Sequence, residues 1–350
     1  MNSFGRLFRV SIFGESHGVN VGVVIDGCPP GISIAIEDFS TDLERRKGGT
    51  KGTTPRKEDD IPEIVSGVFN DRSTGAPITI LFKNSNTRSG DYEKQKAVPR
   101  PGHADFVASK KFDGFQDYRG GGHFSGRLTV ALVAAGVVAK KILTPNPSPQ
   151  VERGTNAEAG LGEVNEGIKI TSTILEIGGE TDLDKGLQKA IDAKDSIGGI
   201  VECRVNDLPI GLGEPFFDAA ESLISHAVFA IPAVRAIEFG TGFAAAKMFG
   251  SIHNDAIENG NGKTTTNHAG GIVGGITNGN ELVFRIAIKP TSSTPQEQQT
   301  LNVDTNTIEP FSVKGRHDLC IALRVPVVLE AATAIVLADL MLVSKKISVK

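Results

Sequence analysis

The sequence predicts an α+β protein in which a layer of helices is covered on each side by an antiparallel sheet. Short β-like runs alternate apolar and polar side chains, as residues 202–206 do, and this pattern is typical of antiparallel strands with one covered face. Two long helical segments, residues 125–143 and 326–345, are apolar on nearly all faces, so both are expected to be buried. A β-α-β sandwich accounts for both observations.

The individual elements follow from periodicity and end signals. Predicted strands are residues 7–13, 21–25, 61–68, 78–82, 168–177, 199–205 and 282–288. Predicted helices are residues 38–47, 104–115, 125–143, 182–193, 216–230 and 326–345. Thr181, with Asp184 three residues on, predicts a capping box for the fourth helix. The last helix carries Glu330 and Asp339, so we expect a buried helix rather than a membrane span.

The composition disfavours a nucleic-acid-binding protein and a metalloprotein. The chain has 350 residues and a net charge of -4, which disfavours nucleic-acid binding. Cys28, Cys203 and Cys320 lie far apart, which indicates a reduced, cytoplasmic protein. The seven histidines include no His-x-x-x-His pair, so no metal is expected. No boundary is visible, and we expect one intertwined domain over residues 1–350, with no membrane partner.

The segment Gly-Glu-Ser-His-Gly at residues 14–18 directly follows a predicted strand. A hydroxyl, an imidazole and free amides on a glycine-flanked turn can bind a phosphate and protonate it. A plain tight turn is an equally good interpretation of this motif alone. The segment also matches the Gly-x-Ser-x-Gly nucleophile elbow, but another strand pattern follows it instead of a helix, which argues against a hydrolase elbow.

Four other segments combine cations with glycine: residues 45–56, 100–105, 117–127 and 315–320. The basic run 45–56 suits phosphate or carboxylate, although alone it fits a solvated helix end better. His103 sits at a predicted helix start, where an N-cap is the simpler interpretation. Three glycines at 120–122 let the backbone approach a ligand closely and favour a binding role. Residues 260–264 and 270–275 lack the spacing of a P-loop or Rossmann site.

Together these blocks resemble the chorismate synthase family over essentially the whole chain. The matching blocks are GESHG at 14–18, RPGHAD at 100–105, YRGGG and its helix at 118–143, KPTSS at 289–293 and the GRHD segment at 315–340. The resemblance implies the β-α-β sandwich, a homotetramer and a carbon–oxygen lyase of the shikimate pathway of aromatic amino-acid biosynthesis, a pathway associated with NADP. Its reaction is the 1,4-anti elimination of phosphate from 5-enolpyruvylshikimate 3-phosphate. The reaction requires reduced FMN, and because no reductase domain is visible, an external flavin reductase must supply it.

The resemblance also implies site residues. His17 would protonate the departing phosphate, His103 would act on the reduced flavin, and Asp318 would assist proton removal from the substrate. Substrate would be held by Ser16, Arg46, Arg56, Arg100, Arg127 and Arg316. Cofactor would contact Arg46, His123, Phe124, Ser125, Ile252, His253, Gly274, Lys289, Pro290, Thr291, Ser292, Ser293 and Arg316.

The chain departs from the commonest family pattern after the three glycines. There the family usually has Arg-Ser-Ser-Ala-Arg-Glu, whereas this chain has His123-Phe124-Ser125-Gly126-Arg127-Leu128. Two other functions stay open at this point. One is a flavin-independent phosphate-ester lyase or hydrolase that uses Ser16 and His17, and the other is a non-catalytic anion-binding module.

Overall fold

Two antiparallel sheets organise the chain, and the computed structural model describes residues 2–55, 58–85, 96–144, 167–313 and 317–347. The N-terminal sheet has the order β1-β2-β3-β7-β4, with strands Ser3–Phe4, Arg9–Gly14, Asn20–Asp26, Ile78–Lys83 and Glu63–Ser66. The second sheet has the order β10-β13-β9-β8, with strands Val234–Phe239, Leu282–Ile288, Gly199–Asn206 and Lys169–Ile177. Their inward faces are apolar, as the alternating sequences require.

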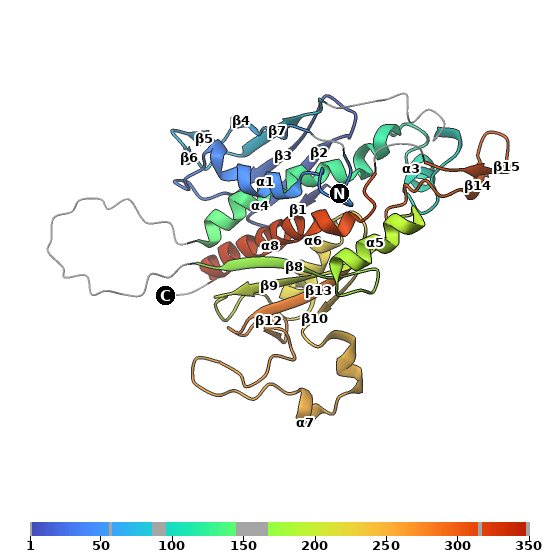
Figure 1. Ribbon diagram of the computed structural model, residues 1–350. Coiled ribbons are helices and arrows are strands. Elements are labelled where there is room, and N and C mark those ends of the chain that lie inside the picture. The colour runs from blue at the N-terminus through green and yellow to red at the C-terminus, as the bar shows by residue number, and fades with distance from the viewer. Residues whose placement is uncertain (1, 56–57, 86–95, 145–166, 314–316, 348–350) are drawn as a thin grey trace.

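Two long helices, α4 (Thr129–Leu143) and α8 (Val325–Ile347), run between these sheets (Figure 1). Helix α4 packs on β3 and β7, and α8 packs on β8 and β9. The helices meet closely at Gly136, where an added Cβ would lie 2.3 Å from Cβ of Ala331. The contact therefore requires glycine on α4 and a small residue on α8.

Shorter elements surround this framework. The helices are α1 (Ser40–Arg46), α3 (Asp105–Lys111), α5 (Leu183–Ala193), α6 (Ala220–Val228) and α7 (Gly250–His253). The two-stranded sheets are β5–β6 (Val68–Phe69, Arg72–Ser73), β11–β12 (Ile272–Val273, Ile276–Thr277) and β14–β15 (Gln298–Asn302, Thr307–Phe311). Short 3-10 turns include Arg119–Phe124, Gly126–Leu128 and Ile321–Arg324.

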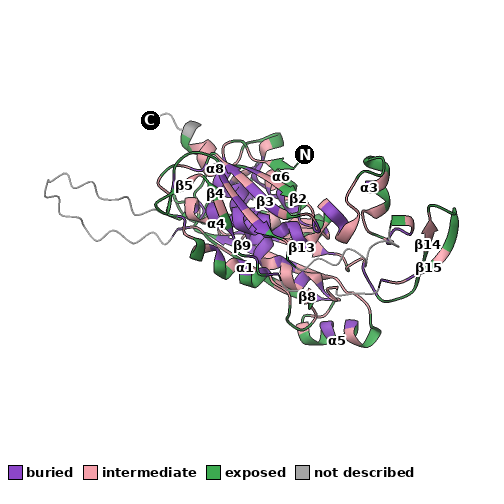
Figure 2. Cartoon of the chain, turned by 90° about the horizontal axis from the view of Figure 1, so that it is seen from above, coloured by how far each residue is buried: buried purple, intermediate pink, exposed green. Residues whose placement is uncertain are grey.

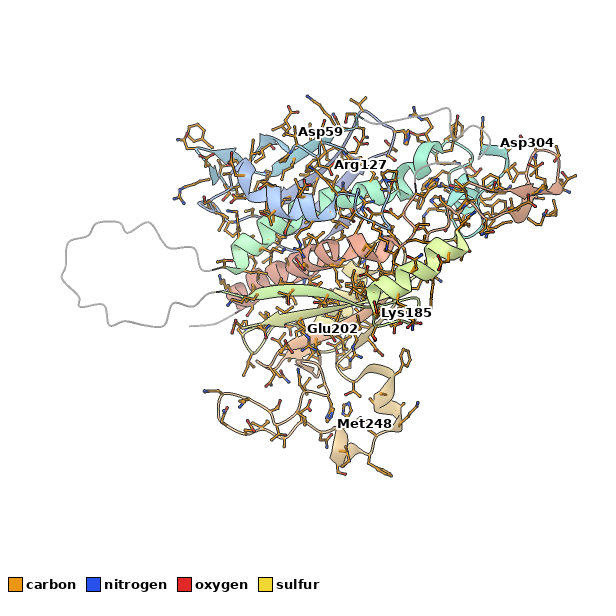
Figure 3. All side chains as sticks on the ribbon, in the orientation of Figure 1. Asp59, Arg127, Lys185, Glu202, Met248 and Asp304 are labelled. Carbon is orange, nitrogen blue, oxygen red and sulfur yellow. The ribbon has the colours of Figure 1, made fainter. Side chains whose placement is uncertain are left out.

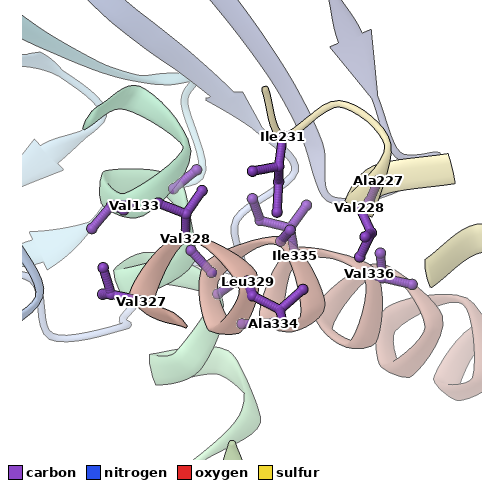
Figure 4. Packing of buried hydrophobic residues seen from close by; sticks show 14 of the residues in the cluster. Val133, Ala227, Val228, Ile231, Val327, Val328, Leu329, Ala334, Ile335 and Val336 are labelled. Carbon is purple, nitrogen blue, oxygen red and sulfur yellow. The ribbon is translucent and has the colours of Figure 1, made fainter. Parts of the chain in front are cut away.

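The main hydrophobic core gathers residues from Phe8 to Leu340, so both sheets share it. Buried residues concentrate along the central helices (Figure 2). Figure 4 shows Val328 and Ile335 of α8 among Val133 of α4 and Ile231 after α6. The segment 321–345 is long and apolar enough to cross a membrane by length and composition alone, yet 78% of its most apolar window is buried inside the protein.

The α+β class is confirmed, and the boundaries correct several predictions. The strand predicted at 7–13 begins at Arg9, because the backbone N–H groups of Arg6, Leu7 and Phe8 donate to the Asp339 carboxylate. The N-cap of α5 is Asp182, which accepts from the Lys185 N–H, and not Thr181. The helix predicted over residues 104–115 ends at Lys111.

Candidate active site

A cavity of about 720 Å³ lies among β1, β2, α4, α6, α8 and the segment that follows β13. Its volume is in the range of small-molecule sites. It brings together predicted site residues from widely separated segments: His17, Arg46, Arg100, His103, His123, Phe124, Ser125, Arg127, Lys289, Pro290, Thr291, Ser292, Ser293 and Asp318.

The glycine turn at 120–122 separates the two predicted catalytic histidines. Gly120 and Gly121 have φ of 60° and 83°, a left-handed conformation that glycine adopts at little cost. A Cβ on Gly120 would lie 2.3 Å from Cε1 of His17, and one on Gly121 would lie 3.0 Å from Cε1 of His103. The two imidazole rings therefore pack against the glycine backbone of this turn, where no side chain would fit.

The second histidine is held by its own motif. Arg100 forms a two-pronged ion pair with Asp105, through Nε at 2.7 Å and Nη2 at 2.8 Å. Asp105 Oδ1 also lies 2.6 Å from Nδ1 of His103. Burial raises the pKa of Asp105, but the hydrogen bonds from Arg100 and His103 outweigh it and hold the pKa well below its usual range. The carboxylate of Asp105 therefore stays charged and holds the side chains of Arg100 and His103 in place.

The segment after β13 is joined to the same motif. Lys289 Nζ donates to the Gly102 carbonyl at 2.7 Å and to Ser292 Oγ at 2.8 Å. Arg100 Nη1 donates to Ser293 Oγ at 3.2 Å. Two blocks that are distant in the sequence therefore form one wall of the cavity.

Arg46, at the end of α1, and Arg127, before α4, share one buried carboxylate; Figure 3 labels Arg127. Asp60 Oδ2 accepts from Arg46 Nη2 at 2.5 Å, and its Oδ1 accepts from Arg127 Nη1. Arg127 Nε donates to Asn84 Oδ1 at 2.9 Å. The Asn84 amide in turn donates to the carbonyls of Glu15 and Gly18, so it ties the turn that carries His17 to Arg127.

Asp318 is fixed near the C-terminal end of α1, through contacts with Thr54 and Arg324. Its Oδ1 accepts from the Thr54 backbone N–H at 2.8 Å, and its Oδ2 accepts from Arg324 Nη1 at 3.1 Å. Arg324 Nε donates to the carbonyl of Arg46 at 2.9 Å. Asp318 and the Arg46–Arg127 pair are therefore parts of one connected network.

This arrangement agrees with the comparisons to known proteins. The sequence model of the family described as chorismate synthase matches residues 8–342. A chorismate synthase of Chitinophaga pinensis is 66% identical over 346 residues, which cover 99% of this chain and 98% of that protein. One of Dehalococcoides mccartyi is 45% identical, with 97% and 96% covered. A solved structure of chorismate synthase superposes with a TM-score of 0.69 at 25% identity, covering 97% of this chain and 93% of the other.

The chain belongs to the chorismate synthase family. It is accordingly a carbon–oxygen lyase that acts on a phosphate ester to form chorismate.

The altered family signature occupies a defined place in the cavity wall. His123 Nδ1 lies 3.2 Å from the Gly14 carbonyl, and its Nε2 lies 3.0 Å from Asn2 Oδ1. Phe124 is 40% exposed, with its ring centre 6.4 Å from that of Phe112. His123 therefore contacts the N-terminal segment that carries β1 and β2, while Phe124 places an aromatic side chain in the cavity wall.

Some predicted residues do not line this cavity. Ser16 is fully buried beside His17. Ile252 and His253 belong to α7, and Gly274 follows β11. Figure 3 labels nearby Met248 below the second sheet, far from Arg127. Arg56 and Arg316 lie outside the described residues.

The hydrolase interpretation finds no support. In a nucleophile elbow the serine hydroxyl is hydrogen-bonded to a base, whereas Ser16 Oγ has no hydrogen-bond partner among the described residues. The turn leads into strand β3 rather than a helix, as the sequence predicted.

Sequence reasoning missed the groups that hold the predicted residues in place: Asp60, Asn84, Asp105 and Arg324. Asp105 could have been found, because it belongs to the RPGHAD block. Asp60 gives a weaker signal, as an acidic residue following a basic run. Asn84 gives none, since its role depends entirely on which strands become neighbours.

Proposed function

We propose that this cavity carries out the 1,4-anti elimination of phosphate from 5-enolpyruvylshikimate 3-phosphate with reduced FMN. The observation that best supports this is the convergence of His17, His103 and several arginines on one cavity. A substrate with a phosphate and two carboxylates needs several fixed cations. Arg46, Arg100 and Arg127 would supply them, together with Arg56 and Arg316 of the sequence prediction.

The residues present fit a flavin. Thr291 Oγ1 and Arg46 Nε are buried and have no hydrogen-bond partner in the described part of the chain, so each has unused hydrogen-bonding capacity that a polar ligand would fill. Burial and the nearby Arg235 lower the pKa of Lys289. Proposed contacts are Arg46, His123, Phe124, Ser125, Lys289, Pro290, Thr291, Ser292, Ser293 and Arg316. When bound, reduced FMN supplies the electron density that this elimination requires.

Residues of the chain itself would donate and accept the protons of the reaction. His17 would give a proton to the departing phosphate, with the buried hydroxyl of Ser16 beside it as a further donor. His103, oriented by Asp105, would hold a proton next to the cofactor. Asp318, anchored by Thr54 and Arg324, would assist removal of the substrate proton.

The assembly is proposed to be a homotetramer. Phe249 and Ile252, in the segment that carries α7, are 83% and 62% exposed. Exposed apolar side chains of this size mark interfaces when they cluster. His253 and Gly274 also lie away from the cavity of a single chain. A neighbouring copy would bring these residues to the cofactor.

The remaining proposals concern organisation and supply. The layered arrangement of helices and sheets is proposed to be the β-α-β sandwich of the family, formed by a single domain over residues 1–350. The enzyme is proposed to work in the cytoplasm and to receive reduced flavin from a separate reductase.

The decisive test is anaerobic turnover of 5-enolpyruvylshikimate 3-phosphate with photoreduced FMN, with oxidised FMN and without flavin. We expect chorismate and phosphate only with reduced flavin. Turnover without flavin would support the flavin-independent lyase, and phosphate release without chorismate would support a hydrolase. Substrate binding without any product would leave only an anion-binding module.

A further inference from the structure

We infer that Asp60 is a positioning residue for the elimination, because its carboxylate holds the guanidiniums of Arg46 and Arg127 as one fixed pair facing the substrate. This inference rests on the proposed function, since it assigns the pair to an anionic group of that substrate. Asp60 itself would touch the two arginines rather than the reacting atoms.

Burial makes this arrangement unusual. The side chain of Asp60 is 0% exposed, while those of Arg46 and Arg127 are 3% and 4% exposed. Three ionic groups are thus removed from water together, and such a cluster is costly unless each charge is compensated. All three residues line the cavity, so the cost is incurred at the ligand site and not in a remote part of the core.

The charges explain why one carboxylate is needed between the two cations. Burial lowers the pKa of Arg46, Asp60 raises it, and the nearby cations Arg324 and Arg127 lower it, so that together they bring it to about 10. Burial raises the pKa of Asp60, but Arg46 and Arg127 outweigh this effect and lower it. Arg46 and Asp60 are therefore both charged at neutral pH. With the guanidinium of Arg127, the trio keeps one net positive charge for an anion.

The geometry leaves donors for that anion. Each arginine uses one Nη on Asp60, and Arg127 is further fixed by Asn84 and by the Lys83 carbonyl at 3.3 Å. Arg46 Nε is buried without a partner among the described residues. A guanidinium held from one side and unsatisfied on another is pre-oriented for a ligand.

The backbone of Asp60 supports the same conclusion. Its φ is 52°, a left-handed conformation that few residues other than glycine, asparagine and aspartate adopt readily. Such conformations persist where surrounding contacts over-determine them, and they cluster at functional sites. Here the two arginine contacts provide that constraint.

The test compares Asp60→Asn, which keeps the shape and removes the charge, with Asp60→Glu, which keeps the charge and changes its reach. For both variants we expect kcat/KM to fall at least tenfold with saturating reduced FMN, mainly through KM. We also expect inorganic phosphate to inhibit them at least tenfold more weakly. Asp60→Glu should recover the melting temperature but not kcat/KM, because the position of the charge is what matters.

Asp42→Asn is the matched control. Asp42 lies on α1, bonds Arg45 at 3.2 Å and Lys140 at 2.7 Å, and does not line the cavity. Its kcat and KM should match those of the parent. Parental kinetics in Asp60→Asn, a change in melting temperature alone, or full recovery of kcat/KM in Asp60→Glu would overturn the inference. If Asp60→Asn does not fold, Asp60→Glu decides the question. An inactive parent would instead refute the proposed function.

Discussion

The imidazole of His17 packs directly against the backbone of Gly120. The Cβ of any other residue at this position would lie 2.3 Å from His17 Cε1 and 2.9 Å from Ser16 Oγ. The position of the histidine therefore depends on the absence of a side chain on the facing turn.

Replacing Gly120 by alanine should displace His17 and lower turnover at least tenfold. The left-handed φ of 60° adds a backbone cost of about 1–2 kcal/mol for alanine. Anaerobic turnover and calorimetry would measure both effects. Gly179→Ala is the control, because Gly179 has a similar left-handed φ of 80°, a Cβ there meets nothing within 4 Å, and it does not line the cavity. Equal turnover in the two variants would show that His17 tolerates displacement.

His17→Ala and His103→Ala should each lower kcat by roughly 10²–10⁴-fold, the usual contribution of a general acid or base. Their defects should differ in kind. Loss of His17 should slow phosphate release, whereas loss of His103 should shift the pH dependence of the spectrum of bound reduced flavin. Stopped-flow phosphate detection and anaerobic spectral titration separate the two. Parental kcat in both variants would reduce these residues to turn-forming roles.

Asn84→Asp should weaken the link between the His17 turn and Arg127. The aspartate keeps an acceptor for Arg127 but loses both donors to the Glu15 and Gly18 carbonyls. Leaving buried acceptors unpaired costs about 1–3 kcal/mol, which urea denaturation would measure, and turnover should fall with it. Asn267→Asp removes a comparable donor, to the Glu281 carbonyl, away from the cavity. It should lose stability without losing turnover; equal loss of turnover in both variants would contradict the linking role.

Acid should destabilise the site through Asp105. The folded-state pKa of Asp105 lies below its ordinary value, so the stability it contributes is present above the unfolded pKa of about 4 and is lost as pH falls toward the folded value. Asp105→Asn should remove on the order of 2 kcal/mol at pH 7 and flatten the acid dependence. The exposed Asp113→Asn serves as control. An unchanged pH profile of unfolding in Asp105→Asn would rule out this contribution.

The framework could be predicted because its signals are local. Helices α4 and α8 are apolar on nearly all faces, and strand β9 alternates buried and exposed residues along most of its length, so burial and period reveal them. Strand β10 and the β14–β15 hairpin were missed. The hairpin is largely polar and anchors through Phe311 in a small cluster with Val98 and Val313, so little in its own sequence favours a strand.

Some residues of the candidate site could likewise be predicted from the sequence, and others could not. His17, His103 and the arginines stand in glycine-rich segments that mark ligand contact. Their assignments remain predictions, but the structure does place His17, His103, Arg46, Arg100 and Arg127 on one cavity. The carboxylate of Asp60 and the amide of Asn84 could not be assigned from sequence, because their partners come from other elements and pair only after the fold has formed.

The contact between Gly136 and Ala331 also sets the distance between the two sheets. Helices α4 and α8 hold the two sheets apart at this crossing, and the same helices contribute Leu132, Val328 and Ala332 to the cavity wall. A single extra methyl group on Gly136 would therefore separate one sheet from the other and widen the cavity. The width of the cavity is thus limited by a residue that does not line it.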